Sequence, residues 1–302
     1  MRILLTGATG LIGRHLLPLL TSEHEVVAVS RSAASLGDTP GVTPCPMDLS
    51  LPLDPGALPE RVDAIIHLAQ SQRHREFPDG AVDIFRVNVA ATAELLDYAR
   101  RAGARQFVFA STGGVCGFKN GPITETDPPM PVGFYLLSKY LGEQLLPPFG
   151  DYFSTVTLRY FFVYGPGQWN TVVASTLERL ARGDAVFLVG PNGIHLNPTY
   201  VQEAAVATQR ALDLEGQHVV NVAGPQTVSF RQLAEIAGRL LERQPVFERT
   251  QSAALDLVGD LKLMHRLLPD VPHIPLEDGL RQTIESYRAR GLEMFHDVQA
   301  QS

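Results

Sequence analysis

Tyr135 and Lys139 are the residues that we would assign to catalysis first, because a phenol and an ammonium group stand four positions apart. On a helix, positions i and i+4 lie on one face, so both side chains would point into the same space. The ordinary pKa of tyrosine is about 10, and a neighbouring positive charge lowers it by favouring phenolate. Such a phenol can donate a proton to a carbonyl or accept one from an alcohol. The same spacing also occurs as ordinary helix decoration, so the pair needs a binding site beside it.

The stretch TGATGLIG, residues 6–13, follows a short apolar run at the start of the chain and predicts such a site. Glycines let the backbone turn sharply out of a strand, approach a pyrophosphate and pack closely on the next helix. Tight turns use glycine as well, but here a strand precedes the stretch, and a helical pattern and a second strand follow it. We therefore predict a dinucleotide site that involves Gly7, Thr9, Gly10, Leu11, Ile12 and Gly13.

A third candidate, Thr112, follows the strand-like run at residues 107–109 in the segment FASTGG. The carboxyl ends of parallel strands are where open α/β sheets bind their ligands, so this hydroxyl could bond the reacting oxygen of a substrate. Serine and threonine also cap helices and close turns, which is the alternative role for this residue.

The elements that must position these residues alternate along the first half of the chain, as is typical of a parallel sheet covered on both faces. Strands are expected at residues 3–5, 26–29, 64–67, 107–109 and 156–158, and helices at 11–20, 82–101, 135–146, 204–212 and 230–241. The predicted fold class is α/β, a Rossmann-like doubly wound parallel sheet with a smaller C-terminal substrate-binding lobe. Residues 1–165 would form the nucleotide-binding domain, rejoined by part of 196–225, and residues 166–302 mainly the second lobe.

The composition favours a cytoplasmic enzyme with a small-molecule substrate. The 302 residues carry a formal net charge of −7, which argues against general binding to nucleic acid or to an anionic membrane. No signal peptide or apolar segment of membrane-spanning length is visible. Cys45 and Cys116 are too few for a disulfide scaffold and are expected to be buried or incidental thiols, and the nine histidines show no metal-ligand spacing.

Together, these motifs resemble the extended short-chain dehydrogenase/reductase family, in particular its NAD(P)-dependent nucleotide-sugar epimerase, dehydratase and ketoreductase branch. The resemblance runs from residue 1 to about residue 225 and includes the segments VDAIIHLAQ, LRYFFVYGPG and NPTYVQEAA. It implies that Thr112 positions the substrate oxygen and that Tyr135 is the acid/base. It also implies that Lys139 lowers the pKa of Tyr135 and holds the nicotinamide ribose, with Ser111 supporting the loop.

The resemblance further implies contacts to the cofactor and the substrate. The additional cofactor positions are Asp48 and Leu49 near the adenine, Leu68, Ala69 and Gln70 after the fourth expected strand, Asn88 on the long helix, and Tyr160 and Phe161 near the nicotinamide. The implied substrate positions are Gly113, Phe162 and Tyr200. No residue is assigned to a metal.

Ser30 and Arg31 depart from the pattern of NAD-preferring members, which place an acid at the end of the second strand. An acid would repel the 2′-phosphate of NADP, whereas serine can donate to it and arginine can clamp it with two hydrogen bonds. We therefore expect a preference for NADP(H). If Arg31 is only a solvated loop residue, NAD(H) would bind as well.

Other departures concern the reaction and the substrate. Gly113 and Gly114 stand where 4,6-dehydratases carry an acidic pair, so dehydration is not expected. Phe162 replaces an asparagine that contacts the sugar nucleotide, and Leu196 replaces an arginine that pairs with the diphosphate. Both changes weaken the prediction of a nucleotide sugar, because a buried diphosphate needs charge-assisted partners. Arg179 or Arg231 could supply that charge instead.

Three functions remain open: an NADP(H)-dependent reductase or dehydrogenase of a sugar-like ketone or secondary alcohol, an epimerase with tightly held cofactor, and a non-catalytic NADP-binding regulator. We place the reductase first and the regulator last, because a regulator needs no tuned phenol. By analogy with relatives, the helix at residues 82–101, through its apolar side with Leu95, Leu96 and Tyr98, and the Tyr135 helix are expected to form a homodimer interface.

Overall fold

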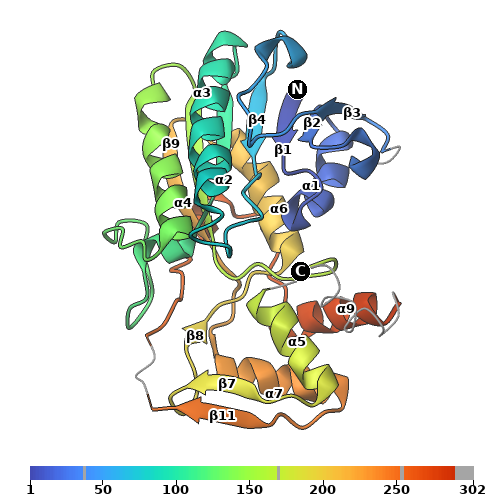
Figure 1. Cartoon of the computed structure of the whole chain (residues 1–302), viewed down its shortest axis with the longest axis vertical. Helices are drawn as coiled ribbons and strands as arrows, with labels where there is room; N and C mark the ends of the chain where they lie inside the picture. Colours follow the sequence, from blue (N-terminus) through green and yellow to red (C-terminus); the bar gives the residue numbers. More distant parts are fainter. Residues whose placement is uncertain (37–38, 169–170, 252–254, 290–302) are drawn as a thin grey trace.

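A seven-stranded, wholly parallel sheet dominates the computed structural model, which describes residues 1–36, 39–168, 171–251 and 255–289 (Figure 1). The strand order is β3-β2-β1-β4-β5-β6-β9. The bounds are β1 Arg2–Thr6, β2 Glu25–Ser30, β3 Val42–Pro46, β4 Ala64–His67, β5 Gln106–Thr112, β6 Ser154–Tyr160 and β9 Gln217–Val222. The predicted fold class is therefore confirmed, and two further strands, β3 and β9, join the five that the sequence predicts.

Helices cover both faces of this sheet, which is why the central strands β1, β4 and β5 are buried along most of their length. One core contains Leu16 of α1 (Leu11–Thr21) and Ala205 of α6 (Val201–Arg210), and it packs on Leu5 and Ile66 of the sheet. The other contains Leu95 and its neighbours on α3 (Ala91–Arg101) and packs on the opposite face. On that face α4 (Phe134–Leu145) lies beside α3. No described helix is long and apolar enough to cross a membrane.

The helix expected at residues 82–101 is interrupted. The structure has α2 (Ala81–Phe85), then a π-helical turn over Arg86–Ala90, and then α3. A π turn adds one residue to the helical turn and is frequent at functional sites. Asn88 lies in this turn and is fully buried.

A smaller region lies below the large sheet in Figure 1 and has its own core of Leu177, Leu188, Leu233 and Ile284. Its strands form two pairs, β7 (Val186–Val189) with β11 (Phe247–Thr250) and β8 (His195–Leu196) with β10 (Val228–Ser229). Its helices are α5 (Val172–Arg182), α7 (Phe230–Leu241) and α9 (Leu276–Ala289). Of these elements the sequence predicts only α7.

The chain passes between the two regions several times. After β8 it returns to the large sheet through α6 and β9, and after β11 it returns again with α8 (Lys262–Leu267). Met264, Leu268 and Val271 belong to the core beside α1. Residues 169–170, 252–254 and 290–302 of the predicted second lobe lie outside the described residues.

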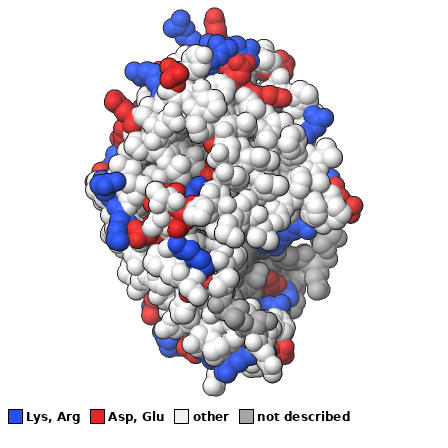
Figure 2. Space-filling view, turned by 90° about the vertical axis from the view of Figure 1, so that its left-hand side faces the viewer, with Lys and Arg blue, Asp and Glu red and all other residues white. Residues whose placement is uncertain are grey.

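The apolar side of α3 is not a free surface, contrary to the sequence prediction. Leu95 and Leu96 are fully buried against the sheet of their own chain, and the hydroxyl of Tyr98 donates to the carbonyl of Pro59 at 2.7 Å. A helix that covers a sheet packs its most apolar side against that sheet. Exposed apolar side chains instead lie on α2 and α4, at Val82, Phe85, Leu137 and Leu141. Figure 2 faces this side of the molecule and shows a wide area without charged side chains.

Candidate active site

The strand order reverses beside β1, which has β2 on one side and β4 on the other. Loops that leave neighbouring strands in opposite directions open a crevice at the carboxyl ends of those strands, and open α/β sheets bind ligands there. The glycine-rich loop leaves β1 at this point, and the residues after β4 lie against it. The amide of Leu68 donates to the carbonyl of Thr6 at 3.2 Å, and the amide of Ala69 donates to Thr6 Oγ1 at 3.2 Å.

The glycine loop forms a cradle that suits a phosphate. Gly7 has a φ of +75°, and a Cβ on Gly13 would lie 2.2 Å from the carbonyl oxygen of Gly7. Gly10 begins α1 without a side-chain cap, and the first turn of the helix carries no acid. The amides at the start of α1 therefore face a space in which they can bind an anion. The loop residues predicted from the sequence, from Gly7 to Gly13, are all in this cradle or in the first turn of α1.

Helix α4 places Tyr135 and Lys139 along β5, where Thr112 is the last residue. The Nζ atom of Lys139 lies 4.5 Å from the centre of the Phe109 ring, and the side chain of Leu136 lies against Gly114. Thr112 Oγ1 accepts a hydrogen bond from the amide of Gly114 at 3.3 Å, so its own proton remains available to a ligand. The fold thus brings all three predicted catalytic residues to one edge of the sheet.

The hydroxyl of Tyr135 donates a hydrogen bond to Gln70 Oε1 at 2.9 Å, and the ring of His74 lies 5.1 Å from the tyrosine ring. Burial raises the pKa of Tyr135 to about 12. The cost of burying a phenolate accounts for this upward shift. The lowering of the pKa by the charge of Lys139, which the sequence predicts, acts in the opposite direction and stays a prediction. Neither Gln70 nor His74 could be assigned to this contact from the sequence.

Lys139 is 2% exposed, and burial lowers its pKa to about 8. The negative charge of Glu143 opposes this shift. His67, at the end of β4, is fully buried between the hydroxyls of Thr6 and Thr92, and burial together with the charge of Lys139 lowers its pKa to about 3. The imidazole is therefore neutral at physiological pH, and Lys139 is the positive charge of this site.

A buried ion pair lies behind Lys139. Glu143, one turn further along α4, accepts from Arg159 at 2.7 Å and from the hydroxyl of Ser111. Both side chains of the ion pair are at most 5% exposed. Ser111 and Arg159 are opposite each other on β5 and β6, so Glu143 joins α4 to both strands. The sequence offers a signal for this pair, an arginine inside the apolar strand TVTLRYFF and an acid four positions after Lys139.

Asn88 braces the site from within the protein. Its Oδ1 accepts from the amide of Ser71 at 2.9 Å, and its Nδ2 donates to Ser138 Oγ at 2.9 Å. The side chain therefore joins the loop after β4 to α4. Both polar ends of the predicted cofactor residue Asn88 are already used within the protein.

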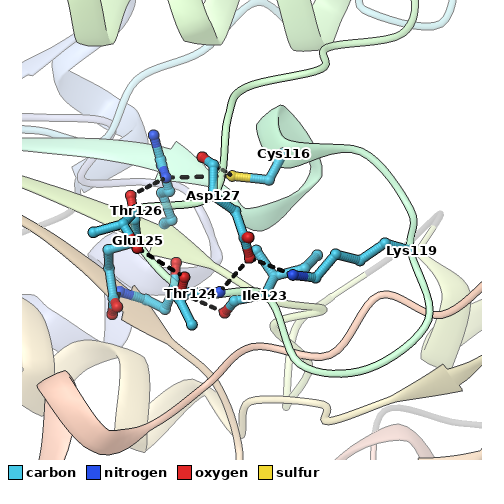
Figure 3. Close-up of polar contacts among 9 residues, drawn as sticks. Cys116, Lys119, Ile123, Thr124, Glu125, Thr126 and Asp127 are labelled. Carbon is cyan, nitrogen blue, oxygen red and sulfur yellow. Dashed lines mark hydrogen bonds and ion pairs between the residues drawn. The ribbon is translucent and has the colours of Figure 1, made fainter.

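The segment that follows β5 turns back on itself, so that Lys119 and Asp127 lie side by side (Figure 3), and the carbonyl of Glu125 accepts from Arg159 at 3.4 Å. Asp127 Oδ2 accepts from Lys119 Nζ at 2.5 Å and from the amide of Thr124 at 2.7 Å. Cys116 Sγ accepts from Arg159 at 3.3 Å, and burial raises the pKa of the thiol. Cys45 is buried as well, so the prediction of buried thiols is confirmed.

The same segment connects β5 to the C-terminal part of the chain. The amide of Ile123 donates to the carbonyl of Val258 at 2.7 Å, and Lys119 and Asp256 exchange backbone hydrogen bonds at 3.0 and 3.2 Å. Asn221 Nδ2 also donates to the carbonyl of Ile123 at 2.9 Å. The loop that begins at the catalytic edge is therefore held by residues far apart in sequence.

The predicted adenosine-side residues lie at the ends of β2 and β3. Ser30 Oγ donates to the carbonyl of Ser32 at 2.8 Å, while Arg31 is exposed. Asp48 Oδ1 accepts from the amide of Ser50 at 2.9 Å, and this bond lowers the pKa of Asp48 with a smaller contribution from the charge of Arg31. Leu49 is buried. No carboxylate stands at the end of β2, as the sequence shows.

The residues predicted near the nicotinamide and the substrate are mostly buried. The hydroxyl of Tyr160 is 2.7 Å from Thr208 Oγ1, and the ring of Phe161 fills the space in front of Gly113. Tyr200 is 3% exposed, and its hydroxyl donates to Gln282. Within this group, Phe162 alone has a partly exposed side chain. Its backbone also has an unusual φ of +46°. Contacts of Tyr160, Gly113 and Tyr200 with a ligand would therefore need side-chain movement or the backbone.

A hollow of about 300 Å³ lies between the two regions of the molecule. Arg75 of the large region and Arg179 of α5 line it, and the guanidinium of Arg179 stacks on the ring of Phe187 at 4.9 Å. Thr171 Oγ1, also in the lining, is buried and has no hydrogen-bond partner among the residues that the structure describes. Leu196 is fully buried in the core of the smaller region.

Comparisons with known proteins agree with this architecture. A model of the NAD dependent epimerase/dehydratase family matches residues 3–223. An uncharacterized UDP-glucose epimerase of Bacillus subtilis is 27% identical, over 94% of this chain and 97% of its own length. A GDP-6-deoxy-D-mannose reductase of Pseudomonas aeruginosa is 28% identical, over 96% and 98%. The structure of a Thermus thermophilus UDP-glucose 4-epimerase with NAD is 29% identical, over 95% and 99%, with a TM-score of 0.79.

Proposed function

Because this chain belongs to the NAD dependent epimerase/dehydratase family, we propose that it transfers hydride between NAD(P) and a secondary-alcohol carbon of a sugar-like substrate. It is an enzyme of the extended short-chain dehydrogenase/reductase type. The observation that carries the proposal is the meeting of Thr112, Tyr135 and Lys139 at one edge of the sheet, beside a glycine cradle. In this proposal the large sheet binds the cofactor and the smaller region binds most of the substrate.

The cradle fits the pyrophosphate of a dinucleotide, since Gly10 has no side chain to enter the space in front of α1 and the amides of α1 are free of a side-chain cap. The bound nicotinamide would supply the hydride acceptor or donor. Gly7, Gly10 and Gly13 would hold the phosphates, and Lys139 would hold the nicotinamide ribose. Arg31 is free to turn toward a 2′-phosphate, and we propose NADP(H) on that ground, although relatives such as the Thermus epimerase bind NAD.

The chain's own residues perform the proton transfer. When a ketone is reduced, Tyr135 donates its phenol proton to the oxygen that gains negative charge, and Thr112 holds that oxygen with a hydrogen bond. Lys139 stabilises the phenolate that remains, because its positive charge lies on the same helix face. When an alcohol is oxidised, the same groups act in reverse, and phenolate is the base.

Two overall reactions use this site. Relatives that are described as UDP-glucose epimerases favour oxidation and re-reduction of one carbon with retained cofactor. The exposed Arg31 and the relative described as a reductase favour net turnover of NADP(H). The comparisons support the epimerase more strongly than the sequence alone does. The amount of nucleotide that stays bound to the protein during purification would distinguish the epimerase from the reductase.

The hollow is the proposed place for the remote part of the substrate. Arg75 and Arg179 supply positive charge from its two sides, and Phe187 supplies an aromatic surface. A nucleotide-activated sugar has both an anionic diphosphate and a flat base, so these groups suit it. The two arginines would take over the charge that is missing at Leu196, which is buried.

We also propose a homodimer that buries the exposed apolar side chains of α2 and α4, beside the exposed Arg86 that follows Val82 by one helical turn. Val82, Phe85, Leu137 and Leu141 are between 39% and 70% exposed there. Apolar patches of neighbouring helices are typical of protein interfaces. This face replaces the buried side of α3 in the dimer that the sequence predicts.

Tyr135→Phe tests the proposed chemistry. The variant keeps the ring but cannot exchange a proton, so turnover of a sugar-nucleotide panel should fall by at least about 100-fold. Titration of the stripped protein with NADPH and NADH should give dissociation constants within about twofold of those of the wild type. Retained turnover in Tyr135→Phe would reject Tyr135 as the acid/base. Release of tightly bound NAD on denaturation would reject the NADP(H) preference and favour the epimerase.

A further inference from the structure

We propose that Gln70 is a positioning residue for Tyr135, which accepts the phenol hydrogen bond in the resting enzyme and turns its amide to donate to the phenolate when the proton has left. The inference rests on the proposed function, because it assigns a partner to the proposed acid/base. Its basis is the direct contact between the Tyr135 hydroxyl and Gln70 Oε1 at 2.9 Å. This is the hydrogen bond that a substrate oxygen would have to replace.

The loop that carries Gln70 is held on both sides of this residue. The amide of Ala69, just before it, donates to Thr6 Oγ1 at 3.2 Å, and the amide of Ser71, just after it, donates to Asn88 Oδ1 at 2.9 Å. Asn88 is fully buried. The backbone at Gln70 therefore has little freedom, and its side chain reaches Tyr135 from a fixed origin.

The helix that carries Tyr135 is tied to the same brace. Asn88 Nδ2 donates to Ser138 Oγ at 2.9 Å, and that hydroxyl donates to the carbonyl oxygen of Tyr135 at 2.7 Å. One buried amide thus sets the separation between the loop of Gln70 and the first turn of α4. The contact between Gln70 and Tyr135 follows from this arrangement.

A primary amide suits both states of the phenol, because it carries an acceptor oxygen and two N–H donors. In ketone reduction, a bound reduced nicotinamide would supply the hydride to the carbonyl carbon, and the O–H bond of Tyr135 breaks as the product O–H bond forms. The phenolate that remains then needs a donor, which Gln70 supplies by rotating its amide. A carboxylate at position 70 could only accept, and a thioether could do neither effectively.

Two other groups act on Tyr135 and must be separated from Gln70 in any test. Lys139 lies on the same helix, and the imidazole of His74 lies 5.1 Å from the tyrosine ring on the same loop as Gln70. Both remain in every variant below, so a change between variants reports position 70. A negative charge at that position disfavours phenolate, and a positive charge favours it.

The first test needs no substrate. In the ligand-free protein, Gln70→Lys should lower the pKa of Tyr135 by about 1 to 3 units from the present value of about 12. Phenolate absorbance gives this pKa after subtraction of the same variant carrying Tyr135→Phe. An unchanged pKa would show that the two side chains are not in contact and would overturn the inference. Because no turnover is measured, failure of the proposed reaction cannot produce that result.

The second test uses the enzyme with cofactor and substrate. For alcohol oxidation, the pH at which kcat/KM rises should move up in Gln70→Glu and down in Gln70→Lys. Gln70→Met has a similar side-chain length but makes no strong hydrogen bond, and it should lose about 3- to 10-fold in kcat with little change in KM. Equal profiles in the charged variants, or wild-type kcat in Gln70→Met, would reject the positioning role. Inactivity of the wild type, with the pKa shift present, would reject the proposed function alone.

Discussion

Burial acts on Tyr135 and Lys139 in the same sense, since it favours the neutral form of each. It raises the pKa of Tyr135 to about 12 and lowers that of Lys139 to about 8. Spacing along a helix therefore does not by itself produce a tuned phenol. Lys139 keeps its charge near neutral pH with help from Glu143 and from the ring of Phe109. The charge of Lys139 therefore depends on Glu143 of α4 and on Phe109 of β5, in addition to its spacing from Tyr135.

The rate of ketone reduction should fall as the pH rises through about 8. The folded-state pKa of Lys139 is lowered from 10.5 to about 8, so its ammonium is present below this value and lost above it. Tyr135 stays protonated over the same range. A pH profile of kcat/KM in the reductive direction measures this alkaline limb, the pH range in which the rate falls. Glu143→Gln removes the charge that opposes the shift, so the limb should move to lower pH.

An unchanged limb in Glu143→Gln would show that another group controls the alkaline loss of activity. The variant also leaves Arg159 without its charged partner, so its thermal midpoint should be recorded beside the profile. Loss of stability alone lowers the amount of active enzyme at every pH, and it does not move the limb.

At the scale of elements, the three glycines of the cradle have different tasks. A Cβ on Gly13 would collide with the carbonyl oxygen of Gly7 at 2.2 Å, whereas a Cβ on Gly10 would meet that oxygen at 3.2 Å. Gly13 therefore permits α1 to pack on the loop, and Gly10 keeps the space in front of α1 open. The sequence predicts these tasks for the motif as a whole, and the geometry assigns them to individual glycines.

Gly10→Ala should weaken dinucleotide binding by at least about tenfold with a small change in stability, because its methyl group enters the cradle. Gly13→Ala should instead destabilise the protein by about 2 kcal/mol or more, since backbone must move to admit the methyl group. Calorimetric titration with NADPH and urea unfolding measure the two effects. Equal loss of stability in both variants would contradict the separation of tasks.

The π turn at Arg86–Ala90 is another feature of an element that the sequence did not predict. The residues RVNVA are compatible with an ordinary helix, and the apolar periodicity on both sides continues through them. What distinguishes the turn is the set of bonds that Asn88 makes to Ser71 and Ser138, 17 and 50 positions away. Such partners are not visible in a local pattern.

At the scale of the whole molecule, each helix over the sheet has one apolar side for its own core, and any further apolar side is exposed. Leu95 and Leu96 belong to the first kind, and Leu137 and Leu141 to the second. Exposed apolar side chains at Leu137 and Leu141 favour association through this face.

Leu137→Asp should weaken the proposed dimer by about 100-fold, equivalent to ~3 kcal/mol, because an unpaired carboxylate would be buried. Light scattering after size exclusion should then give the mass of one chain, 32.9 kDa, where the wild type gives twice this mass. Val246→Asp is the matched control, since Val246 is 58% exposed but lies in the smaller region. A wild type that elutes as a monomer would reject the dimer.

The sequence by itself determined the fold class and the position of the glycine loop, and it selected the three residues that we propose as catalytic. These features depend on local patterns, namely glycine spacing, the alternation of strands with helices, and the i and i+4 positions of Tyr135 and Lys139. Only the tertiary structure decided the direction of the pKa shift of Tyr135, the contact with Gln70, the brace through Asn88 and the face left for a partner. Those properties depend on burial and on contacts between distant segments, which no short stretch of sequence contains.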